Sequence, residues 1–391
     1  MKQDVRETLW RRAVGMELGA QDLRRYARQL LLPGVSTEGQ QRLKTAKVLI
    51  VGMGGLGCPV AAYLAAAGVG CLGLMDDDQV ESSNLQRQIL HGVHDVGRAK
   101  VDSARDSLRL LNDQAELITH GERLTRENAV ERVSDYDVVV DGTDQFSSRY
   151  ILNDACVATG RPLVYGSLFQ FEGQVSVFGM EGGACYRCLL PDPPRPGSIP
   201  SCAEGGVLGA VAGVVGSLQA VEVLKWITGQ GDLLSGRMLY YSSSDATFRT
   251  LQIPRNTSCL ACGEHADLLE QGRLRNHPYY MTSTESCGNR NSITAWELSV
   301  ALRSERPPKV LDVRSKREAE LLPIAGAHLE PLNELPGKLH RLDMTAPWVV
   351  ICQESERAQQ AVKLLRDAGW NDVRMLQGGL EAWLEQTAYP G

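Results

Sequence analysis

The sequence has no excess of positive charge, and its longest apolar run is interrupted by polar and charged residues. Its net charge of −6 argues against nucleic acid as the main partner. Residues Met1 to Arg6 are mixed in charge and lack the apolar core of a signal peptide, so we expect a cytoplasmic protein. The longest apolar stretch, residues 207–227, is interrupted by Gln219, Glu222 and Lys225. This interruption predicts a buried helix and no membrane span.

Length and cysteine content indicate a multidomain enzyme from a reducing compartment. A chain of 391 residues with 43% hydrophobic residues has room for two or three domains. Its ten cysteines point to metal and sulfur chemistry more than to disulfides. We expect a first domain over residues 1–263 that begins with a helical arm (1–45), a linker at 264–292 and a second domain at 293–391.

Both domains follow an α/β pattern with a mostly parallel sheet. In the first domain the expected strands are Val48–Val51, Leu72–Met75, Asp137–Val140, Leu163–Tyr165 and Gln174–Phe178, with helices at Val101–Leu111 and Arg149–Ala158. In the second domain the expected strands are Lys309–Val313, Trp348–Ile351 and Val373–Met375, with helices at Thr294–Arg303, Arg357–Ala368 and Leu380–Glu385.

Glycines at positions 52, 54 and 57 follow the first expected strand. A run of small residues (61–67) and an apolar stretch that ends at Asp76 come next. Glycines let the backbone approach a phosphate, a helix N-terminus faces its negative charge, and an acid about 20 residues further on holds a ribose. This order predicts a Rossmann-like nucleotide-binding βαβ unit.

Amides and cations follow Asp76, in the segment Ser83-Asn84-Leu85-Gln86-Arg87-Gln88 and at Arg98 and Lys100. These groups suit a triphosphate that is attacked at its α-phosphate better than they suit a nicotinamide ring. A dinucleotide-dependent dehydrogenase stays open, as does a merely solvated role for Arg87 and Lys100. We favour ATP.

Two carboxylates follow the apolar run 138–140, at Asp141 and Asp144. Acids at the carboxyl end of a central strand lie over the crevice where α/β sheets bind ligands. One of them would hold Mg²⁺ on the ATP phosphates. For the other, the alternative is a cap on the helix that begins near Gln145.

Two Cys-x-x-Cys pairs lie about seventy positions apart, at Cys185 and Cys188 and at Cys259 and Cys262. Four thiolates close a tetrahedral zinc shell and leave no open position, so such a site is structural. A redox couple or core cysteines are the alternatives.

Cys202 and Cys352 are the candidate nucleophiles. Cys202 comes just before the apolar stretch 207–227, and a helix N-terminus lowers the pKa of a thiol. Cys352 opens a short loop after a strand, where converging amides can hold a thiolate or a persulfide. Their alternatives are a structural cysteine at a helix cap and a buried cysteine at a strand end.

Residues 22 to about 262 resemble the MoeB/ThiF family, the bacterial relatives of ubiquitin-activating enzymes. The motifs that carry the resemblance are Arg25-Tyr26-x-Arg28-Gln29, Val51-Gly-x-Gly-Gly-Leu-Gly57, Asn84-Leu-Gln-Arg87-Gln88, Gly97-x-x-Lys100, Asp141-x-Thr-Asp144, Glu172-Gly-Gln174, Cys185-Tyr-Arg-Cys188 and Gly216-Ser-Leu-Gln-Ala220. The resemblance implies ATP and Mg²⁺ binding. It also implies adenylation of the C-terminal glycine carboxylate of a ubiquitin-like sulfur carrier that ends in Gly-Gly.

The motifs and the resemblance together give one set of expected nucleotide contacts. These residues are Gly52, Gly54, Gly55, Gly57, Asp76, Ser83, Asn84, Leu85, Gln86, Arg87, Lys100, Asp144 and Gln145. The resemblance further implies that Asp144 holds Mg²⁺, that the two cysteine pairs bind zinc and that Arg28 reaches into the partner subunit's site in a homodimer. Cys202 matches the family's crossover-loop thiol. Gln145 departs from the usual asparagine, and Gly142 stands where many relatives have cysteine.

Residues 293–391 resemble a rhodanese domain through Asp312-Val-Arg314, Cys352 and Gln377-Gly-Gly-Leu380-x-x-Trp383. The usual active loop is Cys-x-x-Gly-x-Arg-Ser. Here Ser355 and Ala358 replace its glycine and serine, while Glu354 and Glu356 add negative charge. These acids repel an anion such as thiosulfate, so we expect a persulfide handed over by a cysteine desulfurase.

The expected reaction is adenylation of the carrier followed by sulfur transfer from a Cys352 persulfide. The expected catalytic residues are Arg28, Arg87, Lys100, Asp144, Cys202 and Cys352. Two alternatives stay open: an ATP-dependent activator of a non-carrier substrate such as a tRNA base, and a rhodanese-like domain that only docks. The sequence leaves open which pathway receives the sulfur.

Overall fold

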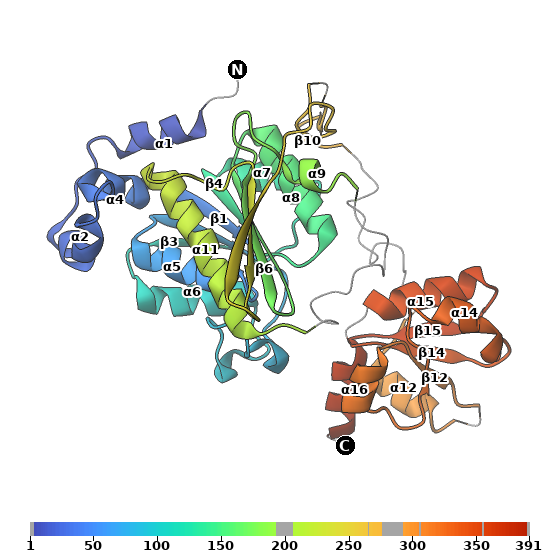
Figure 1. Cartoon of the computed structure of the whole chain (residues 1–391). Coiled ribbons are helices and arrows are strands. Elements are labelled where there is room, and N and C mark those ends of the chain that lie inside the picture. The colour runs from blue at the N-terminus through green and yellow to red at the C-terminus, as the bar shows by residue number, and fades with distance from the viewer. Residues whose placement is uncertain are drawn as a thin grey trace. The chain divides into compact units, whose positions relative to one another are not determined.

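The computed structural model describes residues 4–192, 206–264, 266–275, 292–304, 306–353 and 356–388. The described residues up to 275 form one unit, and those from 292 form a second (Figure 1).

The first unit is built on one eight-stranded sheet, in the order β3-β2-β1-β4-β5-β6-β7-β8. Its strands are β1 (Lys47–Val51), β2 (Cys71–Met75), β3 (Glu116–His120), β4 (Val138–Asp141), β5 (Leu163–Phe169), β6 (Glu172–Phe178), β7 (Arg237–Ser242) and β8 (Thr247–Gln252). The strands from β3 to β5 pair in parallel, and those from β5 to β8 pair antiparallel. The predicted α/β class with a mostly parallel core sheet is confirmed.

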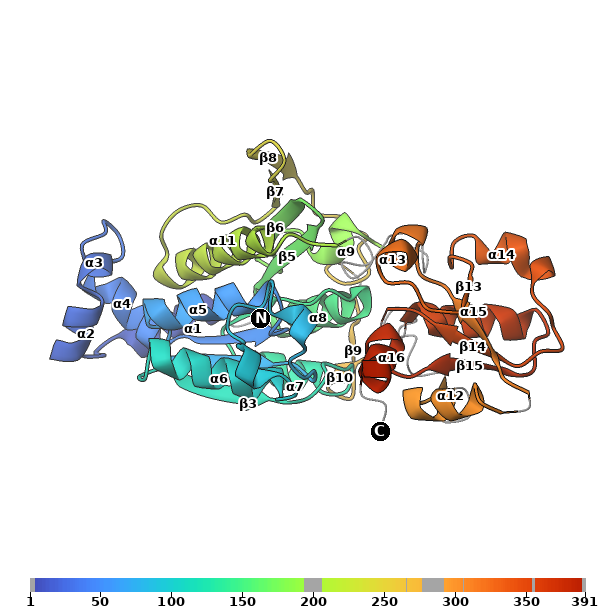
Figure 2. The same ribbon diagram turned by 90° about the horizontal axis from the view of Figure 1, so that it is seen from below.

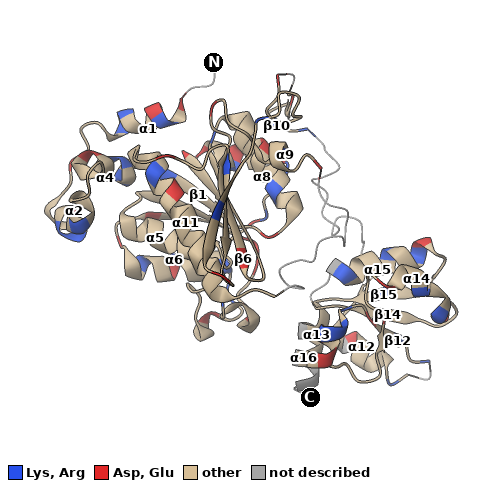
Figure 3. Cartoon of the chain, in the orientation of Figure 1, with Lys and Arg blue, Asp and Glu red and all other residues tan. Residues whose placement is uncertain are grey.

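Helices cover both faces of this sheet. The helices of this unit are α1 (Val5–Ala13), α2 (Ala20–Arg25), α3 (Ala27–Leu30), α4 (Ser36–Thr45), α5 (Gly57–Ala67), α6 (Lys100–Leu111), α7 (Ala129–Ser134), α8 (Phe146–Thr159), α9 (Tyr186–Leu189) and α11 (Gly209–Thr228). The arm helices α1 and α2 carry charge of both signs, with Glu7 and Asp22 near their starts and arginines near their ends. Figure 3 shows both signs on α1.

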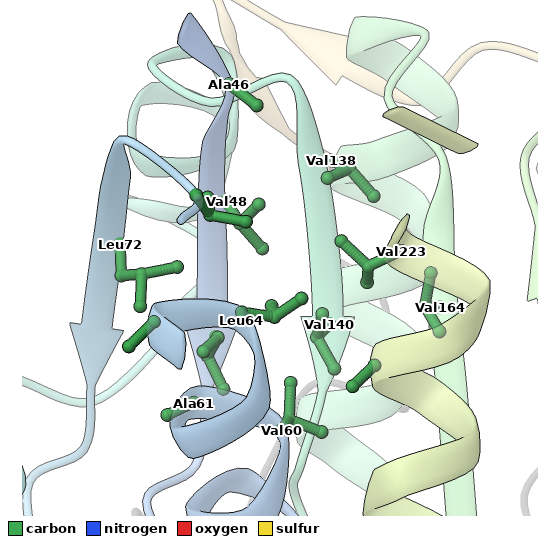
Figure 4. Close-up of a cluster of buried hydrophobic side chains, with 14 of the residues drawn as sticks. Ala46, Val48, Val60, Ala61, Leu64, Leu72, Val138, Val140, Val164 and Val223 are labelled. Carbon is green, nitrogen blue, oxygen red and sulfur yellow. The ribbon is translucent and has the colours of Figure 1, made fainter. Parts of the chain in front are cut away.

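The alternation of side chains along β1 explains the layers. Val48 and Ile50 face one hydrophobic cluster, which is filled by α5, α6 and α11, and Leu49 and Val51 face another, which is filled by α7 and α8. Figure 4 shows Leu64 of α5 packed with strand side chains of the first cluster. Helices α5 and α11 lie side by side in both ribbon views (Figure 2).

The apolar stretch predicted as a buried helix is α11, which begins two residues later than expected. It is long and apolar enough to cross a membrane by length and composition. However, its Gln219 amide is fully buried and donates to the backbone oxygens of Asp141 (2.8 Å) and Val164 (3.2 Å). Glu222 accepts the Leu234 N–H at 2.8 Å. These polar contacts tie α11 to the sheet and its neighbouring loop, as expected of a core helix.

Part of the segment that we assigned to the linker packs on the first unit. Strands β9 (Leu269–Glu270) and β10 (Arg273–Leu274) form a small hairpin, and Leu274 is fully buried against α7 and α8. The packed chain therefore extends beyond the expected boundary at residue 263. Low apolar periodicity over 264–292 hid this contact, because a single buried leucine is enough to anchor a two-residue strand.

The second unit contains a five-stranded parallel sheet in the order β11-β15-β14-β12-β13. Its elements are β11 (Ser292–Ile293), α12 (Ala295–Ala301), β12 (Lys309–Asp312), α13 (Lys316–Leu321), β13 (His328–Leu329), α14 (Leu335–Lys338), β14 (Trp348–Ile351), α15 (Glu356–Asp367), β15 (Val373–Leu376) and α16 (Gly379–Ala388). Alternate residues of β14 enter two hydrophobic clusters, one on each face of the sheet.

Candidate nucleotide site and cysteine centres

The glycine loop between β1 and α5 is too tight for side chains at two of its positions. Gly52 has a φ of +94°, a backbone conformation that other residues rarely adopt. A Cβ atom on Gly57 would lie 1.8 Å from the Gly52 oxygen, which no side chain can tolerate. The N–H of Met53 donates to Asp76 Oδ2 at 2.7 Å, so the loop also orients the acid at the end of β2.

Lys100 stands among carboxylates at this edge of the sheet. Its Nζ lies 2.8 Å from Asp78 Oδ2, and its side chain is mostly buried. Burial lowers the pKa of Lys100, but the charges of Asp76, Asp78 and Asp144 outweigh it and raise the pKa above its usual value. Lys100 is therefore a permanent cation at neutral pH. Burial also raises the pKa of Asp76.

The segment 83–88 packs beside the glycine loop. A Cβ atom on Gly55 would lie 3.4 Å from the Arg87 side chain, and one on Gly54 would lie 3.7 Å from Gln88 Nε2. Arg87 Nη1 donates to the Ser83 oxygen at 3.1 Å. Ser83 and Gln86 are exposed, Leu85 and Arg87 are half-buried, and Asn84 is buried. The structure therefore brings Arg87 to the loop, and its contact with a nucleotide stays a prediction.

Asp141 and Asp144 have different environments. Asp141 is fully buried, accepts hydrogen bonds from the Thr143 N–H (2.9 Å) and Oγ1 (2.7 Å), and has its pKa raised by burial. Arg149 Nε lies 3.9 Å from its Oδ2. Asp144 is exposed. Neither carboxylate caps α8, since the N-cap residue is Gln145 without a side-chain cap, so that alternative is wrong. Asp141 therefore holds the turn, and Asp144 is exposed.

Two other expected contacts lie at the rim of this site or away from it. Gln145 Oε1 accepts a hydrogen bond from Arg123 Nη2. Arg28 lies on α3 with an exposed side chain, and no hydrogen bond or ion pair holds it within the described ranges. Arg28 is not brought to the glycine loop of its own chain.

The four cysteines of the two Cys-x-x-Cys pairs converge on one point. Their sulfurs all lie within 4.8 Å of one another, with Cys185–Cys259 at 3.6 Å and Cys188–Cys262 at 3.4 Å. Zn–S bonds of 2.3 Å in a tetrahedron require S–S separations of about 3.8 Å, close to those found. The hydrogen bond with Cys259, burial and the other sulfurs raise the pKa of Cys185, so four thiolates fit here only around a cation. The cluster is compatible with zinc.

Cys352 lies at the end of β14 and is buried, with 1% exposure. Its carbonyl accepts the Leu380 N–H at 2.9 Å, which joins the candidate active loop to the start of α16. The Arg357 guanidinium on the first turn of α15 makes a two-point ion pair with Glu318 of α13, at 2.7 and 2.8 Å. Cys202, the other candidate nucleophile, lies outside the described residues, as does Glu354.

The sequence patterns did not predict the roles of two residues, Arg149 and His91, near the glycine loop. Arg149 was read only as part of a helix, yet it donates to the Thr143 oxygen at 3.1 Å and so braces the turn that carries Asp144. His91 follows the segment 83–88 and contacts the Met53 oxygen at 3.0 Å. No local spacing signals either contact, because the partners are brought together only by the fold.

Comparisons with known proteins agree with both units. Residues 26–261 match the ThiF family, and residues 295–386 match the rhodanese-like domain. The chain is 39% identical over 386 residues to adenylyltransferase and sulfurtransferase MOCS3 of Aedes aegypti, an alignment that covers 94% of this chain and 88% of that one. It is 41% identical over 376 residues to the probable adenylyltransferase/sulfurtransferase MoeZ of Mycobacterium tuberculosis (strain ATCC 25618 / H37Rv), with 94% of each chain covered.

Solved structures share the fold of the first unit. Escherichia coli MccB with MccA-N7isoASN aligns with a TM-score of 0.56 at 24% identity, and covers 61% of this chain and 75% of that chain. The structure of E. coli MccB with ATP aligns with a TM-score of 0.52 at 25% identity, over 61% of this chain and 74% of that chain. The matches to the two family models and to the MOCS3 and MoeZ relatives show that the chain belongs to the ThiF family and carries a C-terminal rhodanese-like domain, as an enzyme of the adenylyltransferase and sulfurtransferase class.

Proposed function

We propose that the first unit adenylates the C-terminal glycine carboxylate of a ubiquitin-like sulfur carrier, and that the second unit supplies sulfur as a persulfide on Cys352. One observation carries the proposal: Lys100, Arg87 and Asp76 gather at the glycine loop in a chain whose relatives are named for both activities.

In the first step, the carrier carboxylate attacks the α-phosphate of ATP. A carrier–phosphate bond forms, the bond to the β-phosphate breaks, and pyrophosphate leaves with the electron pair. Arg87 and Lys100 stabilise the negative charge that develops, because both side chains are cations. Asp76 would hold the ribose. Mg²⁺ bound by Asp144 would supply further positive charge to the phosphates.

A partner subunit would complete this site. Arg28 is exposed on the helical arm and has no hydrogen bond or ion pair among the described residues, so it is available to a second copy of the chain. Leu31 and Leu32 beside it are also exposed, at 77% and 53%. We therefore propose a homodimer in which Arg28 reaches the partner's phosphates.

In the second step, the terminal sulfur of the Cys352 persulfide attacks the acyl adenylate. A carbon–sulfur bond forms and AMP leaves, which gives an acyl disulfide on Cys352. A thiolate, proposed to be Cys202, then attacks the Cys352 sulfur and releases the carrier thiocarboxylate. The resulting Cys202–Cys352 disulfide needs a thiol reductant, and a cysteine desulfurase would renew the persulfide. These steps require reduced cysteines, which supports a cytoplasmic location.

The cysteine cluster would hold zinc as a structural ion. A shell of four thiolates leaves no open coordination position, so zinc would take no part in either step. It would fix the chain around Cys188 to the chain around Cys262.

The test is mass spectrometry of a purified carrier with a C-terminal Gly-Gly, incubated with the enzyme, ATP and a persulfide donor. We expect conversion to the thiocarboxylate with the wild-type enzyme, and only adenylation with Cys352→Ala. Cys71→Ala, a buried cysteine of β2, is the matched control and should retain both steps. Full thiocarboxylate formation by Cys352→Ala would contradict the sulfur step.

A further inference from the structure

His91 links three elements at the glycine loop. Its Nε2 lies 3.0 Å from the Met53 oxygen, and its Nδ1 lies 2.8 Å from Ser103 Oγ on α6. The ring is buried, with 7% exposure. His91 also closely follows the segment 83–88 that carries Arg87, and Ser103 lies one turn after Lys100 on the same helix. The His91 imidazole therefore joins the glycine loop to the two chain segments that carry Arg87 and Lys100.

The Met53 oxygen fixes the tautomer of this ring. A carbonyl oxygen can only accept a hydrogen bond. Nε2 therefore carries the ring proton and donates a hydrogen bond to the Met53 oxygen. Burial lowers the pKa of His91, which keeps the ring neutral and leaves Nδ1 as an acceptor 2.8 Å from Ser103 Oγ. The Ser103 hydroxyl is shared with the Asp95 carboxylate, whose pKa it lowers. Cys58 Sγ lies 3.4 Å from the same oxygen and donates as well. Burial raises the pKa of Cys58 to about 12, so its thiol keeps its proton.

Both backbone groups of Met53 thus form hydrogen bonds within the protein. The N–H donates to Asp76, and the carbonyl oxygen accepts from His91 and Cys58. In a trans peptide the carbonyl and the following N–H point in opposite directions. The Met53 carbonyl points to His91, so the Gly54 N–H points away from it. No acceptor for this N–H is found in the part of the chain that the structure describes, and Gly54 is partly exposed.

We propose that His91 is a positioning residue that aims the Gly54 N–H at a phosphate of the nucleotide. The inference deepens the proposed adenylation and rests on it. Without the His91 donor, the Met53 carbonyl keeps only the weaker thiol donor of Cys58, so the Met53–Gly54 peptide is held less firmly and the Gly54 amide loses part of its fixed direction. An amide donor acts on developing charge only when it is already oriented, since reorientation during the reaction costs energy.

The test compares His91→Leu, His91→Gln and His91→Asn in the full-length chain. Leucine removes the donor, glutamine extends an amide N–H as far as Nε2, and asparagine is too short to reach the Met53 oxygen. Ser103→Ala is the matched control, because it removes the other ring contact and keeps the donor. The readouts are kcat and KM for ATP in pyrophosphate exchange, KM for the carrier and the thermal unfolding midpoint.

We expect His91→Leu and His91→Asn to lose on the order of 10²-fold in kcat/KM for ATP, with little change in KM for the carrier. His91→Gln should recover most of this loss, and Ser103→Ala should retain activity. Wild-type kcat/KM in His91→Asn would overturn the inference. So would equal loss in His91→Gln and His91→Asn when both unfold at the wild-type temperature. If His91→Leu does not fold, the comparison of glutamine with asparagine decides alone.

Binding of an ATP analogue with a methylene bridge between the α- and β-phosphates separates this inference from the proposed function. Calorimetric titration needs no carrier. If the wild-type enzyme binds the analogue but catalyses no carrier-dependent exchange, the proposed function fails. Weaker analogue binding by His91→Asn than by His91→Gln would still support the inference, and equal binding would overturn it. No binding to the wild-type enzyme would overturn both.

Discussion

Arg187 and Asp154 form a fully buried ion pair between the first Cys-x-x-Cys loop and α8. Arg187 Nη2 lies 2.6 Å from Asp154 Oδ2, Nε donates to both carboxylate oxygens, and the two side chains are 2% and 0% exposed. The cysteine cluster is thereby attached to the helix that begins beside Asp144.

Arg187→Met should destabilise the first unit by about 3–5 kcal/mol, because it leaves the Asp154 carboxylate buried without its partner. The free energy of unfolding, measured with a denaturant, checks this. Arg275→Met is the control. It breaks an exposed pair with Asp267 (49% and 68% exposed) and should cost less than about 1 kcal/mol. Equal costs for the two variants would contradict the role of the buried pair.

Zinc should be present at one ion per chain, since the described residues contain a single four-cysteine cluster. Cys188→Ser should lose the metal and unfold at a lower temperature, because metal binding is coupled to folding. Cys156→Ala, a buried cysteine of α8 outside the cluster, should keep the metal. Elemental analysis and thermal unfolding are the measurements. A metal-free wild-type enzyme that is stable and active would exclude a structural zinc ion in the cysteine cluster.

Lys100→Ala and Arg87→Ala should each slow carrier-dependent pyrophosphate exchange by about 10²–10³-fold, because each removes charge from the phosphates. Both should keep the wild-type unfolding midpoint to within a few degrees, since neither side chain fills an apolar cluster. Arg109→Ala removes an exposed cation from the last turn of the same helix as Lys100 and should exchange at the wild-type rate. Normal exchange in Lys100→Ala would remove this lysine from the site.

The Glu318–Arg357 pair predicts an acid-sensitive contact in the second unit. Burial raises the pKa of Glu318, but the hydrogen bonds from Arg357 and Ser315 outweigh it and lower the pKa to about 2 from the usual 4.5. A lowered folded-state pKa gives stability that is complete above about pH 4.5 and is lost as the pH falls towards 2.

Hydrogen exchange of peptides from α13 and α15 in the full chain measures this effect. Protection should fall across that pH window in the wild type. In Glu318→Gln it should be lower at neutral pH and depend less on pH. Glu320→Gln, an exposed position on the same helix, is the control and should follow the wild type. A Glu318→Gln profile that matches the wild type would show that the Glu318–Arg357 pair does not stabilise the contact between α13 and α15.

Much of the parallel part of the first sheet could be predicted from the sequence, because its central strands consist of buried apolar residues. Strands β1, β2 and β4 are buried along nearly their whole length, so they read as continuous apolar runs. Strands β3 and β8 were missed because their residues are mostly half-buried or exposed and carry no clear alternation. The cysteine cluster was predictable because metal ligands keep a fixed local spacing.

The division of roles within the site could not be predicted. Asp141 and Asp144 are three positions apart and look equivalent in the sequence. However, Asp141 is fully buried and its backbone oxygen accepts a hydrogen bond from Gln219 of α11, whereas Asp144 is exposed. The contacts of His91 join residues 38 and 12 positions away. Such contacts depend on how the loops are stacked at the carboxyl edge of the sheet, which local patterns do not encode.

The central claim is that this chain activates the C-terminal carboxylate of a carrier protein. Pyrophosphate exchange into ATP tests it most directly, with an intact ubiquitin-like carrier ending in Gly-Gly, the same carrier without its last glycine, and tRNA as the possible acceptors. The account predicts exchange with the intact carrier alone. Exchange that is supported by tRNA, or equally by the truncated carrier, would contradict it.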